Sequence, residues 1–147
     1  MKEQGLKLIA KDGEDAQIIS AVLQDAIVPV CDMLYEAAHN SFVLVVHRFL
    51  GKSVNATPEA SCFERVCCAV NVRGVIAAQV QGLELTEHER MLDLLAILLE
   101  GNTLYFVFAG EARIRLQLKD WSMTIEDFGE PWPTPCQPCH DDAAVVT

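Results

Sequence analysis

Apolar and polar positions are most regularly patterned between residues 92 and 118, and this stretch indicates the fold. Two apolar runs, Leu94–Leu99 and Leu104–Phe108, flank the pair Gly101-Asn102. Since Gly and Asn both tolerate positive φ, such a pair between two apolar runs predicts a two-residue hairpin turn. Closing the hairpin at that turn pairs Leu99 with Leu104, Ile97 with Phe106 and Leu95 with Phe108.

A third strand is predicted after Gly110, because Glu111–Lys119 alternates apolar and polar residues with period two. A three-residue turn at Ala109–Glu111 places Ile114 beside Phe106 and keeps the arginines of the strand off the apolar face. We therefore expect a three-stranded meander. Its predicted core face consists of Leu95, Ile97, Leu99, Leu104, Phe106, Phe108, Ile114 and Leu116.

The N-terminal region predicts an edge strand followed by an amphipathic helix. Leu6–Ala10 is a short apolar run, and Asp12 then has the position of a helix N-cap, with Glu14 and Asp15 in the first turn. Pro29 is expected to end this helix, because a proline cannot donate the next helical hydrogen bond. The apolar stripe that we expect to face the sheet consists of Ile18, Ile19, Val22, Leu23, Ala26 and Ile27.

The middle of the chain predicts further strands. A hairpin is expected from Met33–Glu36 and Ser41–Phe49, with Asn40 in the left-handed conformation at its turn. The stretch Cys62–Ile76 is rich in Val and Cys and predicts a long strand with a bend at Gly74. The expected connections are a loop at Gly51–Ser61, a polar turn at Gln79–Arg90 and a short helical turn at Trp121–Phe128.

These elements predict a single α+β domain. About six to seven mostly antiparallel strands would form a curled or half-barrel sheet, covered by the N-terminal helix. The domain is expected to span residues 1–129, and residues 130–147 form a Pro-rich C-terminal tail of extended geometry. The second face of the meander is also apolar, so either the curl of the sheet or a second subunit must bury it. That face consists of Leu94, Ala96, Leu98, Tyr105 and Val107.

The chain of 147 residues is acidic, with 21 Asp and Glu against 11 Lys and Arg and a formal net charge of -10. This charge repels phosphate backbones and anionic lipid, so neither nucleic acid nor a membrane surface is an expected partner. The apolar runs are too short for a membrane span, and residues 1–15 lack the apolar core of a secretory signal. The expected location is the cytoplasm, where the six cysteines would be free thiols.

Several segments along nearly the whole chain resemble a family of small alphaproteobacterial proteins that is catalogued only as a domain of unknown function. The segments that carry the resemblance are LKLIAKDGEDAQIISAVLQDAIV, FVLVVHRF, CFERVCCAVNVRGV, LLAILLE, LYFVFAGEARIRL and DFGEPWPT. The family has no established activity or catalytic residues, so the resemblance implies neither a reaction nor a role for any residue.

Cysteine and histidine provide one candidate site, the C-x-x-C-H motif at Cys136, Cys139 and His140. This is the attachment signature of c-type haem, but such attachment requires export and we expect no signal sequence. The same side chains are zinc ligands, with a fourth ligand needed from elsewhere, and the alternative is an inert tail. Cys67 and Cys68 are adjacent in a strand, point to opposite faces and are expected to be structural thiols.

Arginines provide the other candidate site. If the strands that contain them pair, Arg48 and Glu64 would meet as a cross-strand ion pair next to Arg65. Arg113 and Arg115 project from one strand face and have the donors to hold an anionic ligand bidentately. The alternative for these two arginines is an ordinary solvated strand face that pairs with the excess acid.

No Walker loop, GxGxxG, GxSxG or HExxH motif is present, so the sequence assigns no reaction and no cofactor. We expect a non-enzymatic interaction or binding module that uses the second face of the sheet, with a homodimer or another protein as its partner. The alternative is a small-molecule site or an enzyme for an anionic ligand. Its candidate residues are Arg48, Glu64, Arg65, Arg113 and Arg115.

Overall fold

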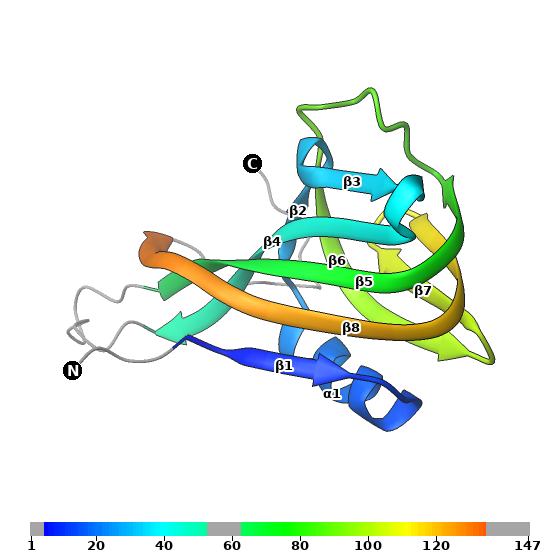
Figure 1. The fold of residues 1–147 in the computed structure, drawn as a ribbon. Helices are drawn as coiled ribbons and strands as arrows, with labels where there is room; N and C mark the ends of the chain where they lie inside the picture. Colours follow the sequence, from blue (N-terminus) through cyan, green and yellow to red (C-terminus); the bar gives the residue numbers. More distant parts are fainter. Residues whose placement is uncertain (1–4, 53–62, 135–147) are drawn as a thin grey trace.

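The computed structural model describes residues 5–52 and 63–134, and Figure 1 shows their arrangement. Within these residues, eight strands, one α-helix and two short 3-10 helices follow one another along the chain. In order they are β1 (Lys7–Ala10), α1 (Gly13–Leu23), β2 (Ile27–Pro29), η1 (Val30–Asp32), β3 (Met33–Glu36), η2 (Ala37–His39), β4 (Ser41–Lys52), β5 (Phe63–Gln81), β6 (Met91–Glu100), β7 (Thr103–Phe108) and β8 (Ala112–Thr134).

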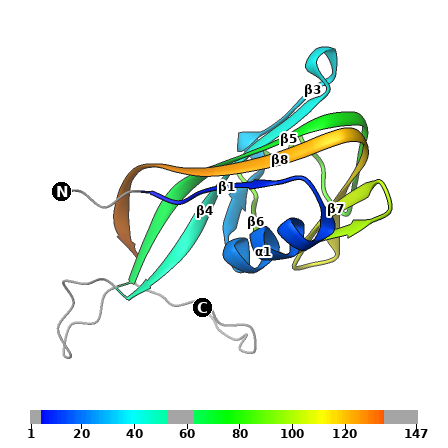
Figure 2. The same cartoon turned by 60° about the horizontal axis from the view of Figure 1, so that its bottom comes forward.

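The strands form one antiparallel sheet that closes on itself. Its order is β1-β8-β5-β4-β2-β6-β7, β3 is attached to β4, and a further pairing of β7 with β8 completes the ring. The two longest strands, β5 and β8, bend through the molecule side by side (Figures 1 and 2). The prediction of a curled, mostly antiparallel sheet with one N-terminal helix in a single α+β domain is confirmed.

Helix α1 packs against β6 and β1 and so covers the interior between these two strands (Figure 2). Its start is as predicted: the Asp12 side chain accepts a 2.8 Å hydrogen bond from the Asp15 N–H. The helix buries Ala16, Ile19 and Leu23. The helix is also tied to the sheet, because the Ile97 N–H of β6 donates a 2.8 Å hydrogen bond to Ser20 Oγ.

The predicted end of the helix is wrong. Helix α1 ends at Leu23 rather than at Pro29, and Asp25 has a left-handed φ of 71°. The chain then pairs with β6, since the Asp25 N–H donates to the Leu94 carbonyl at 2.8 Å and the Leu94 N–H donates to the Ala26 carbonyl at 2.9 Å. These bonds between distant segments replace the helical bonds that the apolar periodicity of Ala26 and Ile27 suggested.

The hairpin at Gly101-Asn102 and the meander have the predicted registers, with one exception. Ile97 is opposite Phe106, which in turn is opposite Ile114. The prediction that Leu95 pairs with Phe108 is wrong, because a bulge between Leu94 and Ala96 places Leu94 there instead. Leu94 is therefore fully buried, whereas Leu95 is 36% exposed.

The β3–β4 hairpin is as predicted, and the predicted long strand is present as β5, but β5 continues past Ile76 to Gln81 into the expected polar turn. Asn40 adopts the left-handed conformation at the turn between β3 and β4, with φ 52°. Gly74 lies at a register shift between β5 and β8 and has φ +84°. A Cβ atom at Gly74 would lie 2.5 Å from the Lys119 carbonyl oxygen, so only glycine fits this bend. The first two residues of the expected loop at Gly51–Ser61 belong to β4 instead, and the rest of the loop lies outside the described residues.

The predicted helical turn at Trp121–Phe128 is wrong, because this segment belongs to β8. It pairs with β5 on one side and with β1 on the other, and Met123 and Ile125 point into the core. Strand β8 continues past Gly129 to Thr134, so the end of the strand does not coincide with the expected boundary at residue 129.

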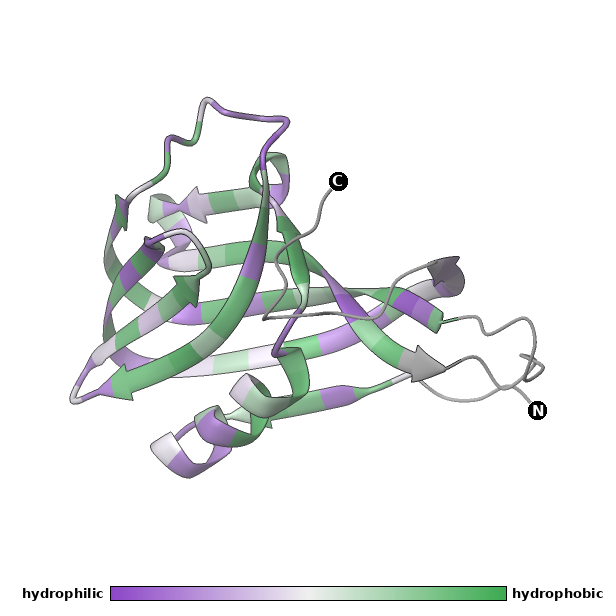
Figure 3. Cartoon of the chain, turned by 180° about the vertical axis from the view of Figure 1, so that it is seen from behind, coloured by the Kyte–Doolittle hydropathy of each residue, from purple (hydrophilic) through white to green (hydrophobic). Residues whose placement is uncertain are grey.

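The interior is filled by the inward residues of the ring and of α1. Its largest fully buried side chains include Phe106, Phe108, Ile19 and Leu23. In Figure 3 apolar residues predominate along the strands, with polar residues interspersed among them. Within the described ranges, no helix combines the length and the apolar character needed to cross a membrane.

Candidate functional site

The outward side of β5, β7 and β8 carries a cluster that we call the basic face. Because Ala112, Ile114 and Leu116 point into the core, the intervening Arg113 and Arg115 must point outward. The ladder then places side chains of the adjacent strands beside them: Gln81 and Val107 are opposite Arg113, and Gln79 and Tyr105 are opposite Arg115. The basic face consists of Gln79, Gln81, Tyr105, Arg113 and Arg115.

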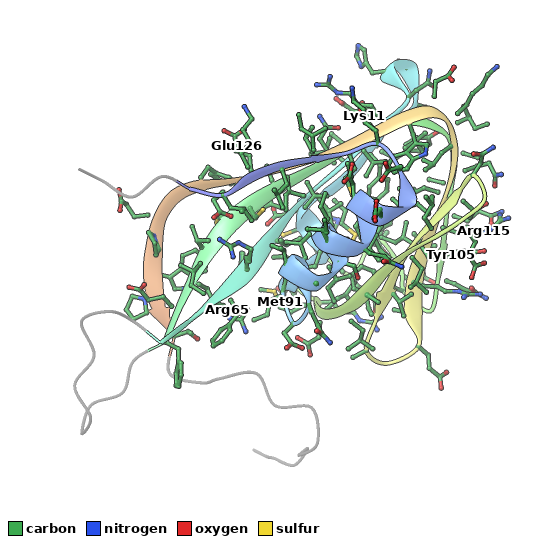
Figure 4. All side chains as sticks on the ribbon, turned by 90° about the horizontal axis from the view of Figure 1, so that it is seen from below. Lys11, Arg65, Met91, Tyr105, Arg115 and Glu126 are labelled. Carbon is green, nitrogen blue, oxygen red and sulfur yellow. The ribbon has the colours of Figure 1, made fainter. Side chains whose placement is uncertain are left out.

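Both guanidinium groups of the basic face are held by neutral side chains. Arg113 Nε donates a 2.9 Å hydrogen bond to Gln81 Oε1, and Arg115 Nη1 donates a 3.2 Å bond to Gln79 Oε1. The Arg113 guanidinium carbon lies 5.3 Å from the ring centre of Tyr105, which is the range of a cation–π contact. Figure 4 shows Tyr105 and Arg115 close together at one end of the molecule.

The two arginines line an open depression of about 400 Å³, together with Gln79, Val80 and Gln81. Among the residues that the structure describes, neither arginine has a carboxylate within ion-pair distance. A guanidinium has five N–H donors and stays charged at any physiological pH. The hydrogen bonds to Gln79 and Gln81 use one donor of each arginine, so several cationic donors of each group face the solvent.

An apolar border continues the basic face onto β6. Leu98 is opposite Tyr105 and is 46% exposed, and the half-buried Val107 is opposite Ala96. This surface contains most of the expected second face of the meander. Leu94 is the exception, because the bulge in β6 turns it into the core.

The structure does not bring the other candidate arginines to this face. Arg48 and Glu64 were expected to meet, but Arg48 is opposite Val66 and Glu64 is opposite Gly51. Arg48 instead forms a bidentate ion pair with Asp127 of β8. The expected cross-strand position is wrong because the register already pairs Arg48 with Val66, two residues along β5 from Glu64, before the bulge between β4 residues 49 and 51.

Asp127 is largely buried, and its carboxylate also accepts a 3.1 Å hydrogen bond from the Leu6 N–H. Burial alone would raise the pKa of Asp127, but the hydrogen bonds from Arg48 and Leu6 and the positive charge of Arg48 lower it overall. Within the described chain this pair therefore joins β4, β8 and the segment before β1, which is a structural role.

Arg65 also has a structural environment. It is 7% exposed and donates hydrogen bonds to the His47 carbonyl at 2.9 Å and to the Asp25 carbonyl at 3.3 Å. Its guanidinium carbon lies 5.3 Å from the Phe49 ring centre, and burial lowers the pKa of the group. Figure 4 shows Arg65 far from Arg115, so Arg65 does not belong to the basic face.

The cysteines on β5 occupy opposite faces of the strand, as expected from their adjacency. Cys68 is fully buried, and burial together with the negative charge of Asp127 raises its pKa to about 12. Cys67 is half-buried, and burial also raises its pKa. Both thiols are therefore protonated near neutral pH, which disfavours nucleophilic chemistry at either of them.

The C-x-x-C-H motif at Cys136, Cys139 and His140 lies outside the described residues. Within residues 5–52 and 63–134, no cluster of three or more His, Cys, Asp or Glu side chains is suited to hold a metal ion.

Sequence reasoning identified Arg113 and Arg115 but missed the residues that hold them. Gln79 and Gln81 were assigned to a polar turn, whereas β5 extends through them to Gln81. Residues two apart in a strand lie on the same face, so the spacing of the two glutamines could have predicted that both point to one side. Their pairing with the arginines could not be predicted from the sequence, because it depends on two register shifts near Gly74.

One protein-family model matches residues 6–140 of the chain, and its description is "Protein of unknown function (DUF2948)". No curated protein and no solved structure matches the chain.

Proposed function

The chain belongs to the DUF2948 family of proteins of unknown function, and we propose that it is a non-enzymatic binding module whose basic face docks an acidic segment of a partner protein. The observation that carries this proposal is the pair of solvent-facing arginines without a carboxylate partner in the described part of the chain. The protein has a formal net charge of -10, so such a pair gives this surface a local charge of the opposite sign.

Charge complementarity favours carboxylates as the groups that bind. Hydrogen bonds between a guanidinium and a carboxylate are stronger than those between neutral groups, and two parallel N–H donors fit the two carboxylate oxygens. The net charge of the protein repels an acidic partner at long range, but salt screens this repulsion beyond about 8 Å at physiological ionic strength. Contacts at the basic face therefore decide the affinity.

The composition of the surface favours a protein partner. Tyr and Arg are enriched at the centres of protein interfaces, where their large side chains combine apolar area with hydrogen bonding. Here Tyr105 and Arg113 stack, and the exposed side chain of Leu98 extends the surface with apolar area. An open surface of this kind suits a chain segment better than a small molecule, which is normally enclosed on most sides.

A small anionic ligand is the second candidate, and the depression of about 400 Å³ between the arginines and Gln79 and Gln81 supports it. Such a ligand would bind the same donors but would need no contact with Leu98. The two candidates therefore differ in whether the apolar border contributes to binding.

Binding to a fluorescent oligoglutamate peptide tests the proposal. The Arg113→Gln/Arg115→Gln variant should weaken binding by roughly tenfold or more, since hydrogen bonds to charged groups contribute about 1.5–3 kcal/mol each. A Lys7→Gln/Arg73→Gln variant removes the same charge from exposed positions of β1 and β5 and should keep most of the affinity. Equal losses in the two variants would show non-specific charge attraction and would overturn the proposal.

Thermal-shift measurements with inorganic phosphate and citrate separate the second candidate from the first. A ligand that binds only the folded state raises the melting temperature. Stabilisation by these anions that is lost in Arg113→Gln/Arg115→Gln but unchanged in Leu98→Ser would support the small ligand. A peptide affinity that falls in Leu98→Ser would support the protein partner.

A further inference from the structure

We propose that the segment bound by the basic face is extended and carries acidic side chains at every second position. The inference rests on the proposed function and specifies the geometry of its partner. It follows from the placement of both arginines on a single strand, with one inward residue, Ile114, between them.

The spacing of the two arginines sets the spacing of the carboxylates. Residues two apart on an antiparallel strand lie about 6.8 Å apart on the same face. An extended peptide repeats its side chains on one side at the same interval, because it has the same backbone rise. A peptide that runs along β8 can therefore place one carboxylate over Arg113 and the next same-side carboxylate over Arg115.

The neighbouring strands hold the two guanidinium groups in position before a ligand arrives. Gln81 Oε1 binds Arg113 Nε and Gln79 Oε1 binds Arg115 Nη1, so each arginine is anchored on the β5 side. The Tyr105 ring supports the Arg113 guanidinium from the β7 side. Fixing these long side chains in advance reduces the entropy lost on binding. The result is two cationic sites at a fixed separation rather than two mobile charges.

The path of the peptide also explains which partner residues would matter. Alternate residues of an extended segment point away from the basic face, so their identity is not restricted by contact with it. The recognition element is therefore an acidic residue, any residue and a second acidic residue in an extended conformation.

Three peptides of identical composition test this geometry, each with two glutamates in a background of Thr, Ser and Ala. The glutamates are placed at positions i and i+2, i and i+1, or i and i+4. The i+1 arrangement points the carboxylates to opposite sides of an extended chain, and the i+4 arrangement brings them together only in a helix. We expect the i+2 peptide to bind roughly tenfold more tightly than the i+1 peptide, since one charged contact is worth about that factor.

The single variant Arg115→Gln provides the matched control. With one arginine left, the i+2 and i+1 peptides should bind equally, because only one carboxylate can then be held at a time. A preference for the i+2 peptide that persists in Arg115→Gln would overturn the spacing argument. Tighter binding of the i+4 peptide would contradict the extended conformation.

These outcomes separate the inference from the function on which it rests. Three peptides that bind equally well, and that all lose affinity in Arg113→Gln/Arg115→Gln, would overturn the spacing and leave the binding module intact. Failure of all three to bind, while oligoglutamate also fails, would overturn both. A dimer of the protein that Arg113→Gln/Arg115→Gln dissociates would identify a second copy as the occupant and would also contradict the inference.

Discussion

At the scale of single residues, Asp127 connects segments of the described chain that lie far apart in sequence. Its carboxylate accepts hydrogen bonds from Arg48, 79 residues away in sequence, and from the Leu6 N–H, 121 residues away. The side chains of Arg48 and Asp127 are only 15% and 6% exposed. A buried pair of this kind is far more sensitive to the loss of one partner than a surface pair.

Replacing Asp127 by Asn should therefore lower the free energy of unfolding by about 3–5 kcal/mol, because Arg48 would be left as an unpaired buried charge. Urea denaturation measures this change. The matched control is Glu126→Gln, at the adjacent exposed position on the other face of β8, which should change stability by less than about 0.5 kcal/mol. Equal effects at the two positions would contradict the structural role of Asp127.

The same carboxylate predicts a dependence of stability on pH. The pKa of Asp127 is lowered in the folded protein, so its ionised form stabilises the fold above the unfolded pKa of about 3.9. This contribution should be lost as the pH falls through the lower folded pKa. The difference in unfolding free energy between the wild type and Asp127→Asn should accordingly shrink as the pH is lowered from about 6 toward 3. A difference that stays constant over this range would contradict the assignment.

At this scale, the sequence predicted the interactions between residues that are close together along the chain and missed those between distant residues. The N-cap at Asp12 and the left-handed turn at Asn40 were predictable, because each depends on residues within a few positions. The partner of Arg48 was not predictable, because only the folded register of β4, β5 and β8 brings Asp127 beside it.

At the scale of elements, β6 shows how one bulge changes the face that a run of residues presents. The run Leu94-Leu95 is apolar at both positions, so the alternation pattern there is consistent with either residue pointing inward. The bulge places Leu94 opposite Phe108 and turns Leu95 outward. The end of α1 was misjudged for a related reason, since tertiary bonds to Leu94 replaced helical ones.

A pair of alanine substitutions tests the bulge directly. Leu94→Ala should lower the free energy of unfolding by about 2–5 kcal/mol, as expected for a buried leucine that leaves a cavity. Leu95→Ala should have a clearly smaller effect, because its side chain is 36% exposed. Urea denaturation of both variants decides between the two registers. The regular hairpin expected from the sequence requires the opposite order of effects.

At the scale of the whole molecule, the closed sheet brings strands that are distant in sequence side by side, and together they form the basic face. Alternation within β8 was sufficient to place Arg113 and Arg115 on one face. The anchoring partners Gln79 and Gln81 come from β5, and their alignment depends on how β5 and β8 bend past Gly74. The two arginines of the candidate site were therefore predictable from the sequence. The glutamines that hold them were not, because only the closed sheet aligns β5 with β8.

The most direct test of the account maps where an acidic ligand binds. Amide resonances of isotope-labelled protein would be followed by NMR during titration with the i+2 glutamate peptide. We predict that the largest shifts occur in β7, at residues 77–81 of β5 and at residues 112–117 of β8, and that Arg113→Gln/Arg115→Gln removes them. Shifts concentrated around Arg48 and Arg65, or shifts unchanged in that variant, would contradict the claim that the basic face is the binding site.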